Sequence, residues 1–301
     1  MSALDSTPRP LTRRTDRLRR RRATSRAMEL LAWVAAAIAV AILGVVVWSV
    51  AKRGASELNL DLLTKTPVPF AIGNVKQGLA NAFVGSLVLV GLATAMALPF
   101  GILVALYLNE FAPAAVKSTV SLVLDVLNGI PSIVIAIFVF GLLVAGHGQS
   151  GLAGSFALAT LMLPLVARAT MEVLALVPDS LREASLGLGV PRWRTTLSIV
   201  LPQTIGGVVT GTVLAVARIA GETAPLLFTS SIVGNSVNWN PAQALQSVPV
   251  AIFELSESPT PSDHARAWAA ALVLLLFILL ASLSARWLAT RSRRKLGRAI
   301  R

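Results

Sequence analysis

The chain has 301 residues, of which 55% are hydrophobic and only 14% are charged, and its mean hydropathy is +0.73. A chain of this length and apolarity is not an ordinary soluble domain, so we predict an all-α protein that crosses a membrane several times. The absence of cysteine excludes disulfides, thiol nucleophiles and thiolate metal sites, and the two histidines fall in predicted loops. We therefore expect no metal, no cofactor and no catalytic residue.

The net charge of +13 would suggest a nucleic-acid partner in a soluble protein. Here, however, most of the lysines and arginines lie in the first 28 and the last 16 residues. Membrane proteins carry their cytoplasmic anchors at such positions, where basic side chains meet lipid headgroups. We therefore expect membrane lipid, and no nucleic acid, to be the partner of these segments.

Six apolar segments are predicted to cross the membrane, because each can cover a hydrocarbon core about 30 Å thick at about 1.5 Å per residue. The first follows a basic tail, residues 1–28, which holds nine arginines and is expected to be disordered or to lie on the membrane surface. The spans and their loops form one transmembrane domain, residues 29–290, which is followed by a second basic tail, residues 291–301. The spans run approximately over Leu30–Val50, Leu79–Leu108, Ser118–Ala145, Leu152–Leu176, Ile205–Phe228 and Arg266–Leu288.

The distribution of basic residues sets the predicted orientation. Both tails and the polar segment 178–202 are expected on the cytoplasmic side of the membrane. Residues 54–78 and the long acidic loop 229–265 are then expected outside. Six spans satisfy all of these placements at once.

The third predicted span carries four polar or helix-breaking residues, Asp125, Asn128, Gly129 and Pro131. Such residues are unfavourable in contact with lipid, so this face should look into the helix bundle or into a water-filled cavity. We expect Pro131 to act as a helix hinge.

The segment 178–202, PDSLREASLGLGVPRWRTTLSIVLP, is a polar island between two apolar spans. Its glycines and internal proline predict a short helix, a turn and a second helix. An acidic residue with two small ones, a glycine six positions after the acid and a later Leu-Pro make this segment resemble the EAA loop of ABC-importer permeases. The resemblance implies that the segment docks in a groove of an ATPase subunit, and Ser185 departs from it where alanine is usual. The implied coupling residues are Glu183, Ala184, Ser185, Gly189, Leu201 and Pro202.

A second match is ARIAGETAPLLFT, residues 217–229, which is similar to the fifth-helix signature of the PstA subunit of phosphate importers. The GIPSIV run, residues 129–134, and Leu163-Pro164 followed by Arg168 are similar to that family too. The resemblance extends from about Asn81 to the carboxyl terminus and implies a type I ABC importer permease fold with six transmembrane helices. The sister subunit of the same importer also has an R-x-x-x-E pattern, but the ETAPLLFT continuation favours the PstA type.

The pair Arg218 and Glu222 is the best candidate for an anion pathway. A charge inside the membrane is unfavourable unless it is paired or hydrated, and Glu222 one helical turn further on could neutralise Arg218. The forked guanidinium suits phosphate oxygens, so Arg218 could exchange Glu222 for substrate. A structural ion pair is the alternative. Arg168 and Glu172 repeat the spacing nearer the cytoplasmic end, where either a pathway role or anchoring fits.

Together these features predict the transmembrane permease subunit of an ATP-driven phosphate importer in the bacterial inner membrane. The chain has no Walker A pattern, so ATP hydrolysis is assigned to a partner and the chain itself is not an enzyme. The resemblance implies a homologous permease subunit, two ATPase subunits and an external phosphate-binding protein as partners. The alternative cargo is sulfate or molybdate. A membrane-embedded enzyme is not favoured, because the sequence contains no nucleophile–base or cofactor motif. A secondary transporter is not favoured either, because it would show repeated halves, and the sequence shows none.

Overall fold

The computed structural model describes residues 12–68, 77–231, 234 and 236–299. By its internal contacts the chain divides into two compact units, residues 1–52 and 53–301. Within the described residues the first unit consists of the helix α1 (Thr12–Gly54) up to residue 52, and this helix begins well before Leu30, where the sequence predicted the first span to start. Its apolar stretch is exposed. Residues 1–11 of the expected basic tail lie outside the described residues.

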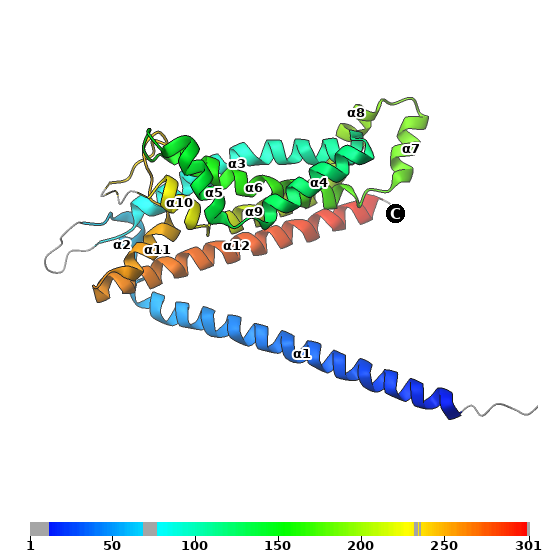
Figure 1. The fold of residues 1–301 in the computed structure, drawn as a ribbon, viewed down its shortest axis with the longest axis horizontal. Helices are drawn as coiled ribbons and strands as arrows, with labels where there is room; N and C mark the ends of the chain where they lie inside the picture. The colour runs from blue at the N-terminus through cyan, green and yellow to red at the C-terminus, as the bar shows by residue number, and fades with distance from the viewer. Residues whose placement is uncertain (1–11, 69–76, 232–233, 235, 300–301) are drawn as a thin grey trace, which may run out of the picture. The chain divides into compact units, whose positions relative to one another are not determined.

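The second unit is a bundle of helices, and the part of the chain that the structure describes contains no strand (Figure 1). In Figure 1, α7 and α8 lie at one end of this bundle, α2 and α11 lie at the other, and α12 ends on the side of α7 and α8. Short 3-10 and π-helical turns are labelled η. The elements are η1 (Ala55–Glu57), α2 (Leu60–Thr64), α3 (Ala80–Leu106), η2 (Tyr107–Phe111), α4 (Ala114–Gly129), α5 (Ser132–Val139), η3 (Phe140–Val144), α6 (Gly151–Leu174), α7 (Asp179–Gly187), α8 (Arg192–Thr195), η4 (Thr196–Val200), α9 (Leu201–Ile219), α10 (Ala224–Thr229), α11 (Val248–Glu257) and α12 (Pro261–Ala299).

The core of the bundle lies where α6 packs against α3 on one side and α9 on another. Fully buried side chains such as Leu89 in α3 and Met162 in α6 form its centre. Glycines let α9 approach α6 closely: a Cβ atom at Gly207 would lie 2.5 Å from a side-chain carbon of Val173, and one at Gly211 would lie 2.6 Å from the side chain of α6 opposite it. Small residues at such contacts are typical of membrane helices, which gain their packing energy from close approach.

Five helices in the described residues are long and apolar enough to cross a membrane, and the pair α4 and α5 makes a sixth span if it is counted as one. The two helices of this pair meet at an angle of 96°. The sequence predicted one span over Ser118–Ala145 with Pro131 as a hinge, and the structure divides this span into two helices at that place. The bend falls at Ile130 and Pro131, because proline disfavours the helical conformation of the residue before it and cannot donate a backbone hydrogen bond.

The fifth predicted span also differs from the observed helices. A single helical rod runs from Arg192 to Ile219 through α8, η4 and α9, so it begins well before the predicted Ile205 and contains Pro202. The π-helical turn η4 comes just before this proline, where the regular backbone hydrogen bonding of an α-helix is disturbed. The rod then ends nine residues before the predicted Phe228, and α10 follows as a separate short helix.

The predicted loop 229–265 contains a helix, α11, that the sequence did not indicate. It packs on α12 and α3, and Gln246 just before it donates a hydrogen bond of 2.7 Å to Glu254 in its second turn. Burial raises the pKa of Glu254 above the ordinary value of 4.5, although the hydrogen bond from Gln246 opposes the shift. At the beginning of the second unit, the guanidinium of Arg53 lies 4.9 Å from the centre of the Trp268 ring in α12.

Candidate functional site

Residues 178–202 fold into a helical hairpin, which we call the α7–α8 hairpin. The first helix begins after Pro178, and the chain reverses at Gly189, whose φ of +79° lies in the left-handed region that favours glycine. The hydroxyls of Ser185 and Thr195 are 2.8 Å apart and buried, so they tie the two helices together. The helix–turn–helix predicted from the sequence is therefore present, and Ser185, the departure from alanine, has a hydrogen-bond partner.

The outer face of the α7–α8 hairpin is exposed and partly apolar. Glu183 and Ala184 lie on the surface, and near them Leu188 is 84% exposed and Trp193 is 59% exposed. Exposed apolar side chains gathered in one place commonly mark a surface that another protein covers. Of the other predicted coupling residues, Leu201 and Pro202 lie at the start of α9, away from the turn.

Arg182 joins the hairpin to the membrane helices, a role that sequence reasoning missed. Its guanidinium donates to both carboxylate oxygens of Glu110 at 3.0 and 3.3 Å and to Asp179 at 2.9 Å. It also donates to the backbone carbonyls of Leu174 and Val177 at 3.0 and 2.6 Å. Burial opposes the charge, yet the hydrogen bond and charge of Glu110, together with Asp179, raise the pKa of Arg182 above its ordinary value.

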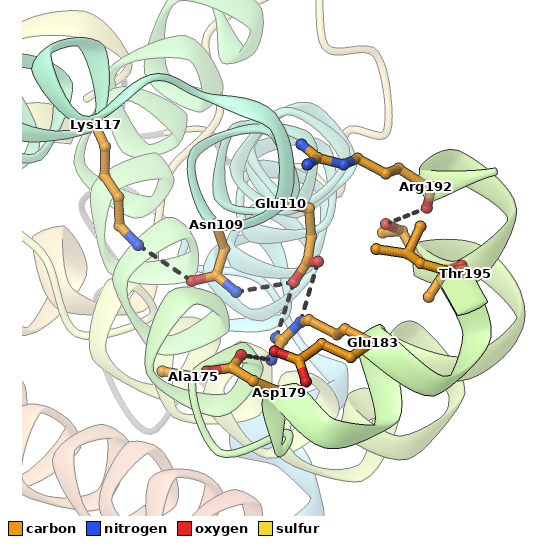
Figure 2. Close-up of a pocket in the computed structure, with 11 residues that line it drawn as sticks. Asn109, Glu110, Lys117, Ala175, Asp179, Glu183, Arg192 and Thr195 are labelled. Atoms are coloured by element: carbon orange, nitrogen blue, oxygen red, sulfur yellow. Dashed lines mark hydrogen bonds and ion pairs between the residues drawn. The ribbon is translucent and has the colours of Figure 1, made fainter. Parts of the chain in front are cut away.

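A cavity of about 390 Å³ lies beside this arginine (Figure 2). Figure 2 shows Glu110, Asn109 and Lys117 in a chain along one wall, with Asp179 and Glu183 facing them from α7. Asn109 donates to Glu110 at 2.9 Å, and the Lys117 ammonium lies 3.5 Å from the Asn109 oxygen. The cavity is thus bounded by α7, α8, η2 and the first turn of α4.

A second cavity, of about 210 Å³, lies in the membrane part of the bundle and holds both Arg218 and Glu222. Leu161 and Leu165, near the middle of α6, also line it, which places it at about half the depth of that helix. The bend between α4 and α5 closes it with further residues, of which the polar ones are Asn128 and Ser132.

The structure brings Arg218 and Glu222 to one cavity without joining them. The sequence placed both on one helix a turn apart, but α9 ends at Ile219, so Glu222 lies in the turn before α10. Gly221 and Pro225 account for this end, since glycine stops helices and proline begins them. Within the described residues neither the Arg218 guanidinium nor the Glu222 carboxylate has a hydrogen-bond or ion-pair partner, and Arg218 is exposed.

The other predicted pair, Arg168 and Glu172, is not joined either. Arg168 forms an ion pair with Asp125 of α4 and donates to the backbone carbonyl of Ser121 at 2.6 Å, while its Nε is buried without a partner. Glu172 is exposed on α6. Neither residue lines the cavity that contains Arg218. Among the described residues, no group of three His, Asp or Glu side chains could hold a metal ion.

Comparison with known proteins first defines the class. The family model described as binding-protein-dependent transport system inner membrane component matches residues 97–294, which is most of the bundle. Among solved structures, a bacterial alginate ABC transporter in complex with an alginate-bound periplasmic protein has a TM-score of 0.55 at 16% identity and covers 84% of this chain and 94% of its own. The inward-facing MetNI methionine ABC transporter has a TM-score of 0.54 at 16% identity and covers 71% and 93%. The chain is therefore a multi-pass inner-membrane transport component with the ABC importer permease fold, as predicted, and not an enzyme.

Relatives of known sequence define the family more narrowly. A phosphate transport system permease protein PstA from Xylella fastidiosa is 42% identical over 247 residues, 80% of this chain and 84% of the relative. That of Yersinia pestis is 41% identical over 246 residues, 80% and 81% of the two chains, and PstA 1 of Mycobacterium tuberculosis is 42% identical over 225 residues, 72% of each. The chain belongs to the PstA family of permease subunits, and the resemblance found in its sequence is confirmed.

Proposed function

We propose that this chain is the permease subunit of an ATP-driven importer of inorganic phosphate and that the cavity of Arg218 and Glu222 is part of the route of the anion. The observation that carries the proposal is the unpaired Arg218 guanidinium in a cavity midway along α6. An arginine in a membrane is unfavourable unless it is hydrated or paired. A guanidinium with free donors, next to the amide of Asn128 and the hydroxyl of Ser132, suits the oxygens of phosphate.

Glu222 in the same cavity supports weak and transient binding. A carboxylate repels an anion and attracts the arginine, so the substrate has to compete for Arg218. Weak binding is what a conduit requires, because an ion that binds too tightly does not leave. The proposal does not extend to Arg168 and Glu172, whose pathway role remains a prediction.

The α7–α8 hairpin is proposed as the surface that receives an ATPase subunit, with Glu183 and Ala184 in the contact. Its exposed Leu188 and Trp193 support this role. We propose the orientation that the basic residues predict, in which the hairpin and both chain ends face the cytoplasm. The end of the bundle with α2 and α11 then faces an external phosphate-binding protein. The complete importer would contain a homologous permease subunit and two ATPase subunits.

The decisive experiment is uptake of radiolabelled phosphate by the complex reconstituted in vesicles, with sulfate and molybdate as competitors. Arg218→Gln should abolish uptake without loss of the assembled complex. The matched control is Arg286→Gln, which removes the same charge from an exposed position on α12. Uptake at the wild-type rate by Arg218→Gln would refute the route, and inhibition by sulfate or molybdate as strong as by unlabelled phosphate would favour the alternative cargo.

The hairpin is tested separately with Glu183→Lys. This variant should assemble in the membrane and lose ATP-driven uptake, because a reversed charge would oppose the contact with the ATPase. Normal uptake by this variant would refute the docking role of Glu183. A cysteine introduced at Leu188 in this cysteine-free chain should react only with reagents applied from the cytoplasm.

A further inference from the structure

Arg182 uses its whole hydrogen-bonding capacity in one place. A guanidinium has five N–H donors, and each of the five has a partner here: two on Glu110, one on Asp179 and one on each of the carbonyls of Leu174 and Val177. The arginine side chain is 18% exposed and that of Glu110 is 8% exposed. A charge pair buried to this degree holds its geometry, because separating the two groups would leave each charge without a partner and shielded from water, which is strongly unfavourable.

The partners of Arg182 belong to different helices. Glu110 lies in η2, the π-helical turn that ends the long helix α3, while Leu174 is the last residue of α6. Through Asn109 the same network reaches Lys117 in the first turn of α4. One side chain of α7 therefore bonds to the ends of α3 and α6 and is connected to the start of α4.

Two further attachments of α7 lead to other helices. Residues 175–178 connect it covalently to α6, and the Ser185–Thr195 hydrogen bond joins it to α8, which continues without a break into α9, the helix of Arg218. Without Arg182, α7 would keep these links to α6 and α9 but would lose its link to α3 through Glu110.

We propose that the Arg182–Glu110 pair transmits displacement of α7 to α3, so that α3 and α9 move together when the hairpin is pushed. The inference rests on the proposed coupling role of the hairpin and deepens it. The pair acts as a positioning pair: its side chains bond within this chain, and neither lines the cavity that contains Arg218. Geometry matters more than charge here, since lysine has three donors and no fork and could not replace all five bonds.

The test uses the complete complex in vesicles and measures phosphate transported per ATP hydrolysed. Arg182→Gln and Glu110→Gln should each lower this ratio on the order of tenfold, while the amount of assembled complex and its ATP hydrolysis stay near wild type. The double variant should be no worse than either single one, because residues that act as a unit are non-additive. Arg182→Lys should give an intermediate ratio, and Arg286→Gln should leave the ratio unchanged.

A second readout does not depend on transport. Spin labels on cysteines introduced at Leu188, just after α7, and at Phe111, at the end of η2, report the distance between the two elements. The distribution should be narrow in the wild-type background and broad in Arg182→Gln. An unchanged distribution, an unchanged ratio, or additive losses in the double variant would overturn the inference.

The outcomes separate this inference from the docking proposal. If Glu183→Lys uncouples transport and Arg182→Gln does not, the docking role stands and the transmission role is wrong. If Glu183→Lys transports normally, the docking role fails, and the spin-label distances still decide whether Arg182 holds α7 to α3. If Arg182→Gln lost the assembled complex, Arg182→Lys would decide: an assembled complex with a lowered ratio supports the transmission role, and an assembled complex with the wild-type ratio overturns it.

Discussion

Replacing Arg168 by methionine distinguishes an anchor between α4 and α6 from a residue on the anion route. Methionine matches the unbranched stem of arginine as far as its Nε but removes the guanidinium, with its hydrogen bond to the Ser121 carbonyl and its ion pair with Asp125. We expect Arg168→Met to destabilise the folded chain, and the double variant Arg168→Met/Asp125→Asn to recover most of the loss.

The magnitude follows from three contributions. A hydrogen bond from a charged donor stabilises by about 1.5–3 kcal/mol. An aspartate left without a partner costs about 2.5–3.5 kcal/mol at the centre of a membrane helix, and the cost is smaller for Asp125, whose side chain is 62% exposed. The substitution also removes the buried and unpartnered Nε, which costs about 1–3 kcal/mol in the wild type. The single variant should therefore lose about 2 kcal/mol and the double variant about 1 kcal/mol or less.

The assay is reversible unfolding of the purified chain in mixed micelles, followed by phosphate uptake at equal amounts of folded complex. An anchor predicts normal uptake by the folded double variant. A single variant within about 0.5 kcal/mol of wild type, or a double variant as unstable as the single one, would refute the reasoning. Loss of uptake by a stable double variant would place Arg168 on the anion route, which is the other role that the sequence left open.

Three further predictions concern packing, the hairpin and pH. Gly211→Val should destabilise the bundle by about 1–3 kcal/mol, because its Cβ would lie 2.6 Å from that of Ala169; a thermal midpoint equal to that of the wild type would contradict this contact. Ser185→Ala should cost no more than about 1 kcal/mol and preserve uptake, since the Thr195 hydroxyl keeps a second acceptor at 3.4 Å; complete loss of uptake would show that the hydroxyl is essential to the hairpin. The raised pKa of Glu254 means that the folded state binds this proton more tightly than the unfolded state, so stability should fall as pH rises from the ordinary value of 4.5 through the folded pKa. Glu254→Gln should remove this fall when thermal unfolding is measured at a series of pH values. A pH profile of the variant equal to that of the wild type would contradict the prediction.

The fold could be predicted from the sequence where a single local signal decides. The length of each hydrophobic run predicted the membrane spans, and the spacing of Gly189 and Pro191 predicted the turn of the hairpin. The break after Ile219 was missed although Gly221 and Pro225 were visible, because the apolar run continues across it and length alone favours one helix. The bend at Pro131 was foreseen as a hinge, but its angle depends on how α5 packs against α6 and α10.

In the candidate sites, too, local patterns could be predicted and contacts between distant residues could not. Arg218 and Glu222 were singled out because they share a motif, and both line one cavity in the structure. Arg182 was missed because its main partner, Glu110, lies 72 residues away, and nothing local marks either residue as one of a pair. Likewise Arg168 was assigned to Glu172 by helical spacing, whereas its partner Asp125 comes from another helix. Pairing across helices depends on packing, which a single sequence does not reveal.

The close contact of α9 with α6 at Gly207 and Gly211 has a mechanical consequence. The rod Arg192–Ile219 packs against α12 as well as α6, and Ala215 and Ile219 near its far end belong to the same buried core as side chains of α3 and α6. Added volume at either glycine would therefore displace a helix that carries Arg218 near one end and continues into the α7–α8 hairpin at the other, so a packing defect in the middle of this helix should disturb the Arg218 cavity and the hairpin together.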